Sequence, residues 1–260
     1  MRERLQTAIA AARAAGGILN RGHGRGFDVR EKTQSRMSVV TEIDLHSHEA
    51  IVEVLAAAFP DDAILSEEGT VGDIESGSLW VVDPLDGTAS YAHGFPFYCV
   101  AIAYCDGGGV ALAVVYDPRH DDLFTAVRGE GAFHNGQPMA VSATAGLRGA
   151  ILATQVQSED PAVLDNFAWR VRQFVAVARD VRTTGAPALV LAYVARGWLD
   201  AFCEEALSPW DTLAGALLIT EAGGRVTAFD TAPRPLLASS DILASNAILH
   251  DDLAAILARR

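Results

Sequence analysis

Apolar and polar residues follow two periods along the chain, and these periods predict its helices and strands. Apolar positions spaced three and four residues apart are typical of helices, whereas short apolar runs bounded by turn residues are typical of buried strands. We expect helices at residues 3–19, 41–58, 161–178, 186–196, 209–222 and 247–258. We expect strands at residues 64–65, 79–82, 97–105, 110–116, 123–127, 151–154, 199–203 and 242–244.

The arrangement of these elements changes near residue 150. Before it, Asp-Gly and Asp-Pro turns and an Asn135-Gly136 hairpin signal join consecutive strands, which predicts an antiparallel region. After it, strands and helices alternate, and no linker divides the two regions. The sequence therefore predicts a layered α/β fold, an αβαβα sandwich, formed by a single domain of residues 1–260 with two packed halves, about 1–150 and 151–260.

The composition narrows the partners that we expect. The 260 residues are 50% apolar, and 33 Asp and Glu against 20 Lys and Arg give a formal net charge of −13. Binding to nucleic acid requires clustered cations, and anionic lipid repels an acidic surface. We therefore expect neither nucleic acid nor a membrane as a partner.

Other classes of protein are excluded by patterns that the sequence lacks. Cys99, Cys105 and Cys203 form no Cys-x-x-Cys pair, which argues against a disulfide framework and against a zinc site. The chain has neither a signal-peptide pattern nor a continuous apolar run of the roughly 18 residues that a membrane span requires. A cytoplasmic location is therefore expected.

Acidic residues gather where predicted strands end or helices begin. They form three groups, Ser66-Glu67-Glu68-Gly69, Val82-Asp83-Pro84-Leu85-Asp86 and Trp210-Asp211-Thr212. Strand ends line the ligand sites of α/β folds, so Asp83, Asp86 and the Leu85 carbonyl between them can face one pocket. Mg²⁺ prefers such oxygen ligands, and the helix that begins after Gly87 offers N–H groups to a phosphate. Taken alone, each group also fits a turn, a solvated loop or an ordinary helix start.

The combination of four segments resembles the inositol monophosphatase family. Its first signature is similar to Trp80-Val-Val-Asp-Pro-Leu-Asp-Gly-Thr-Ala-Ser-Tyr-Ala-His93, and its second to Trp210-Asp-Thr-Leu-Ala-Gly-Ala-Leu-Leu-Ile-Thr-Glu-Ala-Gly-Gly224. Glu67-Glu68 lies upstream of the first signature, and Val40-Thr-Glu-Ile-Asp44 matches the family's Val-Thr-x-x-Asp segment. The segments occur in the family's order, and the resemblance extends from the first helix to at least Gly224.

The resemblance implies a Mg²⁺-dependent phosphatase with the sugar-phosphatase type of αβαβα sandwich, and a homodimer. It implies two to three Mg²⁺ ions, held by Glu67, Asp83, the Leu85 carbonyl, Asp86 and Asp211, with Asp83 shared between two of them. The catalytic residues that it implies are Asp44, Glu67 and Thr88. Those implied for the substrate are Asp86, Gly87, Thr88, Gly185, Ala186 and Glu204.

The sequence departs from the family where the alcohol part of a substrate would lie. The family has a Gly-Ser/Thr-Ala-Ala run where this chain has Gly185-Ala186-Pro187-Ala188. Ala186 therefore lacks the hydroxyl of the family's Ser or Thr, and Pro187 lacks a backbone N–H. Leu213 replaces a smaller family residue. Lys32 or Arg36 stands for a basic residue of the family, and the roles of Lys32, Glu68 and Glu205 stay open.

Several functions are compatible with these residues. We expect a phosphomonoesterase that acts on a small-molecule phosphate monoester, a polyol phosphate, with inositol 1-phosphate as the leading substrate. The alternatives within the family are histidinol-phosphate phosphatase, fructose-1,6-bisphosphatase and 3′-phosphoadenosine 5′-phosphate phosphatase. A binding protein that lost catalysis on the same fold is the alternative from another class. It would be expected to lack a site carboxylate or Thr88, and all of these are present.

Overall fold

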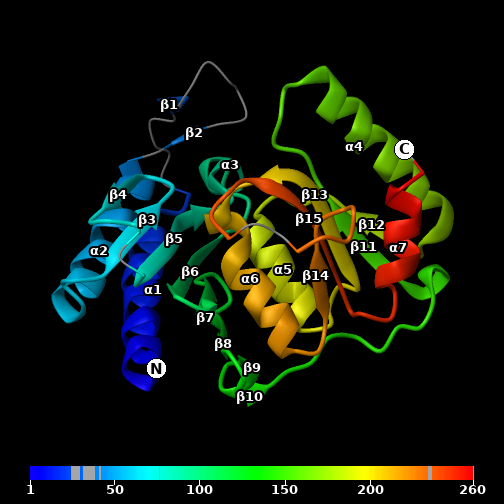
Figure 1. Ribbon diagram of the computed structural model, residues 1–260. Helices are drawn as coiled ribbons and strands as arrows, with labels where there is room; N and C mark the ends of the chain where they lie inside the picture. Colours follow the sequence, from blue (N-terminus) through cyan, green and yellow to red (C-terminus); the bar gives the residue numbers. More distant parts are fainter. Residues whose placement is uncertain (25–29, 32–38, 41, 76, 234–235, 260) are drawn as a thin grey trace.

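The computed structural model describes residues 1–24, 30–31, 39–40, 42–75, 77–233 and 236–259. Its layers follow the order helix, sheet, helix, sheet, helix, as the sequence predicts (Figure 1). One outer layer consists of α1 (Arg2–Gly22) and α2 (Glu42–Ala58), and the other of α4 (Pro161–Val177) and α7 (His250–Leu257). The middle layer consists of α5 (Pro187–Ala195) and α6 (Pro209–Glu221). Among the described helices, none is long and apolar enough to cross a membrane.

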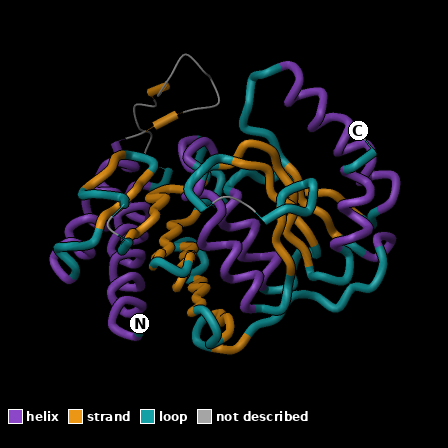
Figure 2. Tube along the Cα trace, in the orientation of Figure 1, coloured by secondary structure: helices purple, strands orange, loops and turns teal. Residues whose placement is uncertain are grey.

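The first sheet has eight strands in the order β10-β9-β8-β7-β6-β5-β3-β4. Figure 2 shows strands and helices alternating as layers across the molecule. All neighbours pair antiparallel except β3 and β5, which are parallel. The strands are β3 (Ala63–Ser66), β4 (Gly69–Val71), β5 (Leu79–Asp86), β6 (Cys99–Asp106), β7 (Gly109–Asp117), β8 (Asp122–Val127), β9 (Gly131–His134) and β10 (Gln137–Pro138). The short helix α3 (Thr88–Ala92) follows β5, and β1 (Arg30–Glu31) pairs only with β2 (Val39–Val40) among the described strands.

The second sheet has five strands in the order β12-β11-β13-β15-β14. Its strands are β11 (Ile151–Thr154), β12 (Asp180–Arg182), β13 (Ala201–Leu207), β14 (Arg225–Thr227) and β15 (Ser240–Ser245). β11 runs parallel to both of its neighbours, whereas β15 is antiparallel to β13 and β14. β11 and β13 therefore end at the same edge of the sheet.

Both faces of each sheet are buried, which explains why the strands are continuous apolar runs in the sequence. In β5, Trp80 and Val82 pack towards α1 and α2, whereas Leu79 and Val81 join the core around α5 and α6. The second sheet contributes Ala153 to this middle core, and Leu152 packs on the opposite face with residues of α4 and α7. The three cysteines are free and buried, as expected of small core residues.

The structure corrects several expected boundaries. β5 does not end before Asp83 but continues to Asp86, and the strand expected at residues 199–203 is β13, Ala201–Leu207. Strands β4, β12 and β14 have three residues each and were not expected, because strands this short are defined by their partners rather than by their own apolar pattern. The Asn135-Gly136 hairpin is confirmed, with φ of 48° and 75°. Thr41, the expected start of the second helix, lies outside the described residues.

The two middle helices approach each other closely at a glycine. A β-carbon added at Gly215 of α6 would lie 2.3 Å from the β-carbon of Leu191 on α5, which is closer than packed atoms come. The absence of a side chain at this position therefore sets the distance between the two helices. Their N-terminal ends both reach the cavity described below, so this contact also affects the site.

We expect Gly215→Ala to lower the free energy of unfolding by about 1–3 kcal/mol, because the added methyl group overfills a packed contact. Gly17→Ala in α1 is the matched control, since its β-carbon would meet only the mobile end of Arg21, at 3.4 Å. Alanine is the better helix former, so the control should gain up to about 1 kcal/mol. Urea unfolding of both variants measures the difference, and equal stabilities would contradict the tight contact.

Candidate active site

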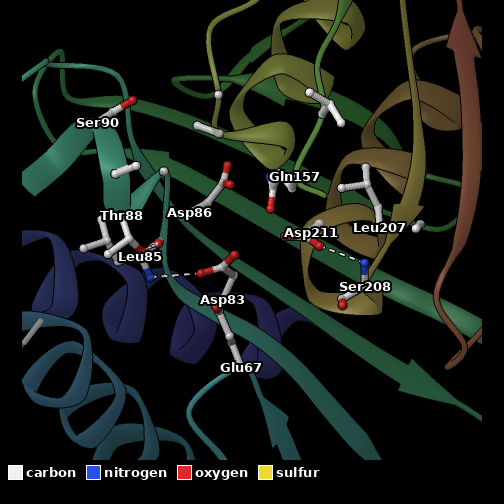
Figure 3. Close-up of a pocket in the computed structure, with 16 residues that line it drawn as sticks. Glu67, Asp83, Leu85, Asp86, Thr88, Ser90, Gln157, Leu207, Ser208 and Asp211 are labelled. Atoms are coloured by element: carbon white, nitrogen blue, oxygen red, sulfur yellow. Dashed lines mark hydrogen bonds between the residues drawn. The ribbon is translucent and has the colours of Figure 1, made fainter. Parts of the chain in front are cut away.

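A cavity of about 440 Å³ lies where the carboxyl ends of β5, β11 and β13 meet the N-terminal ends of α5 and α6. Figure 3 shows Asp83, Asp86 and Thr88 on one side of the cavity and Gln157, Leu207 and Ser208 on the other. Its walls are formed by Glu67, Asp83, Leu85, Asp86, Gly87, Thr88, Ala89, Ser90, Val156, Gln157, Gly185, Ala186, Ala206, Leu207, Ser208 and Asp211. The three acidic groups singled out in the sequence therefore reach one cavity.

Three carboxylates form the polar centre of the cavity. Oxygens of Asp83, Asp86 and Asp211 all lie within 4.8 Å of one another, although Asp211 is more than 120 residues away in the chain from the other two. Asp83 and Asp86 are buried, and Glu67 lines the same cavity. Such a set of oxygens has the spacing and charge that a divalent cation requires.

A bulge in β5 lets Asp83 and Asp86 share this position. In a regular strand, residues three apart point to opposite faces. Here Asp83 pairs with Ala101 and Asp86 with Cys99, so three steps along β5 match two steps along β6. The extra residue turns both carboxylates towards the cavity. The sequence predicted that Asp83 and Asp86 face one pocket, and the strand irregularity is how the structure achieves it.

Each of the three carboxylates accepts a hydrogen bond from one backbone N–H group. Asp83 Oδ1 accepts from Leu85 at 3.0 Å, and Asp86 Oδ2 accepts from Leu189 of α5 at 3.1 Å. Asp211 Oδ2 accepts from Ser208 at 2.8 Å, in a capping box at the start of α6. Asp211 is thus an ordinary helix-start acid and a member of the cluster at the same time.

The cluster is electrostatically unfavourable in the protein alone. Burial, followed by the negative charges of Glu67, Asp86 and Asp211, raises the pKa of Asp83 well above its usual range. Burial and the charge of Asp211 raise the pKa of Asp86 in the same way. A bound cation would favour the ionised form of both groups. The donor set therefore fits a hard divalent metal ion.

Thr88 connects the cavity to Asp44 on α2. Its hydroxyl lies 2.9 Å from Asp44 Oδ1 and 3.0 Å from the Leu85 carbonyl oxygen, so its single hydrogen is shared between two acceptors. Asp44 is buried and does not itself line the cavity. Gly87 precedes Thr88 with a φ of 91°, and a β-carbon there would lie 2.9 Å from the Phe97 carbonyl oxygen. Glycine is therefore required at this turn.

The second half of the chain supplies an unusual carboxyl group. Glu204 is buried, and neither of its oxygens has a hydrogen-bond partner among the residues that the structure describes. Burial, followed by the charge of Asp211, raises the pKa of Glu204 well above its usual range. Contrary to a simple substrate contact, Glu204 does not line the cavity surface but lies behind it. Glu205 points the other way, towards α4, as strand alternation predicts.

The structure brings most of the expected site residues together. Glu67, Asp83, Leu85, Asp86, Gly87, Thr88, Gly185, Ala186 and Asp211 line the cavity, whereas Asp44 and Glu204 lie behind its walls. Ala186 has a φ of 51° and forms the N-cap of α5 without a side-chain hydrogen bond, and Pro187 follows it. Lys32 and Arg36 lie outside the described residues.

Sequence reasoning missed two groups that position Asp86. The Leu189 N–H and the Cys99 thiol, whose Sγ lies 3.4 Å from Asp86 Oδ2, both donate to this carboxylate. Neither has a signal in the sequence, because Leu189 contributes only its backbone and Cys99 fits an ordinary buried strand position. Ser208 was also missed, although a serine before Pro209 at a helix start indicates an N-cap.

The chain matches the inositol monophosphatase family over residues 1–260, and it belongs to that family. Nus factor SuhB of Pseudomonas aeruginosa is 41% identical over 253 residues, 95% of this chain and 92% of the relative. Inositol-1-monophosphatase of Synechocystis sp. is 36% identical over 255 residues, 98% and 88% of the two chains. The solved structure of inositol monophosphatase from Anabaena has a TM-score of 0.88 and 36% identity, covering 99% of this chain and 96% of that one.

We expect Asp83→Asn to raise the melting temperature of the metal-free protein near pH 7 by about 2–4 °C, since it removes one of the repelling charges. Added Mg²⁺ should raise the melting temperature of the unaltered protein and have little effect on the variant. Asp117→Asn is the control, because Asp117 is also buried but accepts hydrogen bonds from the N–H groups of Arg119 and His120. That change should lower the melting temperature. A fall for Asp83→Asn in chelator would contradict the repulsion.

Proposed function

We propose that the protein is a Mg²⁺-dependent phosphomonoesterase that acts on a small polyol phosphate, with inositol 1-phosphate as the leading substrate. The observation that carries the proposal is the cluster of Asp83, Asp86 and Asp211, whose oxygens lie within 4.8 Å of one another in the wall of one cavity. Family membership supports the same class of reaction. Because the similar proteins carry both the name Nus factor SuhB and the name inositol monophosphatase, the substrate has to be tested directly.

The metal ligands would be Glu67, Asp83, the Leu85 carbonyl, Asp86 and Asp211, which together would hold two to three Mg²⁺ ions. When bound, these ions supply positive charge against the phosphate dianion and acidify water. The protein contributes the fixed orientation of its carboxylates through the N–H groups of Leu85, Leu189 and Ser208. A preorganised oxygen set of this kind lowers the cost of assembling the charged complex.

Thr88 and Asp44 are suited to orient the attacking water and to receive its proton. A Thr88 hydroxyl that donates to Asp44 Oδ1 keeps a lone pair on the cavity side, where it can accept a hydrogen from water. Asp44 is buried behind it and can take up the threonine proton in turn. The N–H groups of Gly87 and Thr88 would hold a phosphate oxygen at the start of α3.

The alcohol part of the substrate would lie against the second half of the chain. The cavity wall there is formed by Val156, Gln157, Gly185, Ala186 and Leu207. Glu204 lies behind this wall, and we assign it to the alcohol side of the site, where it would reach a substrate hydroxyl only past the wall residues. Burial raises the pKa of Glu204 and so favours the protonated carboxyl, which can both donate a hydrogen bond to a hydroxyl and accept one from it.

A phosphatase screen tests the proposal. The purified protein is assayed with inositol 1-phosphate, histidinol phosphate, fructose 1,6-bisphosphate and 3′-phosphoadenosine 5′-phosphate in millimolar Mg²⁺ and in EDTA. We expect phosphate release from inositol 1-phosphate that is lost in EDTA and recovered with Mg²⁺. Full activity in EDTA would reject the metal mechanism, and a preference for another ester would replace the substrate. Sedimentation of the same sample tests the proposed homodimer.

We expect Thr88→Ala to lower kcat by roughly 100-fold or more with little change in KM, since the backbone N–H stays and the hydroxyl that contacts water is lost. Thr220→Ala is the control, because that hydroxyl bonds a helix carbonyl on the exposed side of α6. It should leave both constants unchanged. A rise in KM at constant kcat for Thr88→Ala would assign the residue to binding alone.

A further inference from the structure

The carboxyl ends of β11 and β13 form the wall of the cavity that faces Asp83, Asp86 and Asp211. The two strands are parallel neighbours, with Thr154 beside Cys203. β11 ends at Thr154, whereas β13 continues through Glu204 to Leu207 along β15. The residues that follow β11, Val156 and Gln157, line the cavity, as do those that complete β13. Figure 3 shows Gln157 and Leu207 across the cavity from Thr88. The position of these two strand ends therefore shapes the half of the cavity that is furthest from Thr88.

The buried guanidinium of Arg170 forms hydrogen bonds with the ends of both strands. Arg170 of α4 is only 2% exposed, and its guanidinium divides its hydrogen bonds between the strands. Nε donates to Thr154 Oγ1 at 2.9 Å and Nη2 to the Gln155 carbonyl oxygen at 3.3 Å, both at the end of β11. Nη1 donates to Glu205 Oε2 of β13 at 3.0 Å. A planar guanidinium can bridge such separate acceptors, whereas an ammonium cannot reach them all.

The same face of α4 reinforces the contact with β13. Asn166, one helical turn before Arg170, donates to Glu205 Oε1 at 2.7 Å, so both oxygens of Glu205 are held by α4. The next residue, Ala206, lines the cavity with a φ of 60°, a conformation that costs a non-glycine residue free energy. It lies in a bulge, since Glu204 pairs with Ile242 and Leu207 with Ser240. The hydrogen bonds from Asn166 and Arg170 to Glu205 therefore stabilise the strained conformation of the neighbouring Ala206 in the cavity wall.

We infer that Arg170 is a positioning residue for the alcohol part of the substrate. It acts through the ends of β11 and β13, and so through Gln157, Glu204 and Leu207, without touching the substrate itself. The inference rests on the proposed phosphatase function. It distinguishes two parts of the site, because the carboxylates and Thr88 that would act on the phosphate are held by contacts that do not involve Arg170.

Steady-state kinetics with two esters tests this role. The alcohol part of inositol 1-phosphate carries several free hydroxyl groups, whereas the nitrophenyl group of 4-nitrophenyl phosphate carries no hydroxyl. We expect Arg170→Met to raise KM for inositol 1-phosphate at least about tenfold, with kcat/KM for 4-nitrophenyl phosphate changed less than about twofold. Inhibition by inorganic phosphate should be unchanged. Arg170→Lys keeps the positive charge but loses the planar guanidinium with its several N–H donors. Its KM for inositol 1-phosphate should therefore lie between that of the unaltered protein and that of Arg170→Met.

Glu205→Gln provides a second, milder variant, because it keeps the shape of the side chain while weakening the contact with Arg170. It should show the same selective rise in KM even where Arg170→Met does not yield folded protein. Arg182→Met is the matched control, since Arg182 pairs with Asp180 on the exposed edge of the same sheet. It should leave both esters unaffected.

The outcomes distinguish failure of the positioning role of Arg170 from failure of the proposed phosphatase function. Loss of activity towards both esters in equal proportion would assign Arg170 to stability alone and overturn the inference while leaving the proposed function intact. Unchanged KM values in both Arg170→Met and Glu205→Gln would overturn it as well. Absence of activity of the unaltered protein towards both esters in Mg²⁺ would overturn the proposed function, and with it the positioning role.

Discussion

The repulsion among Asp83, Asp86 and Asp211 is the constraint that the rest of the structure has to meet. Asp83 and Asp86 are buried and Asp211 is partly exposed, and carboxylates within 4.8 Å of one another repel unless they are protonated or bind a cation. Each is fixed by one N–H group, and the three N–H groups come from a strand bulge, from α5 and from the start of α6. A bound cation would offset this repulsion, so the geometry that destabilises the metal-free fold would also favour the binding of metal.

This constraint also explains why the two halves of the chain are packed so closely. The first half supplies Asp83 and Asp86, and the second half supplies Asp211 and the Leu189 N–H that holds Asp86. α5 and α6 carry these groups between the two sheets, and their separation is set by the contact at Gly215. A small change in that separation would move one carboxylate relative to the others. The middle helix layer is therefore part of the site, although only its ends reach the cavity.

The sequence predicted the layers, and it predicted that the residues from Asp83 to Thr88 lie together, because both depend on local patterns. Strands buried on both faces are continuous apolar runs, and the residues from Asp83 to Thr88 are neighbours in the chain. The bulge in β5 could not be predicted, because it is defined by the register against β6. Arg170 could not be predicted either, since a charged residue in an amphipathic helix is expected to face water, and only the folded structure shows it enclosed.

The carboxylate side and the opposite side of the cavity thus differ in how far apart in the sequence their residues lie. The carboxylate side combines the short segment from Asp83 to Thr88 with Glu67 and Asp211, and these residues stand in motifs that can be recognised in a single sequence. The opposite side combines β11, α4 and β13 through Arg170 and Glu205, and its strained bulge at Ala206 depends on contacts between distant segments. A substitution in any of these elements can reshape the opposite side without altering the carboxylates. Reaction chemistry can therefore stay constant while the preferred alcohol changes, which is why the motifs identify the reaction more sharply than the substrate.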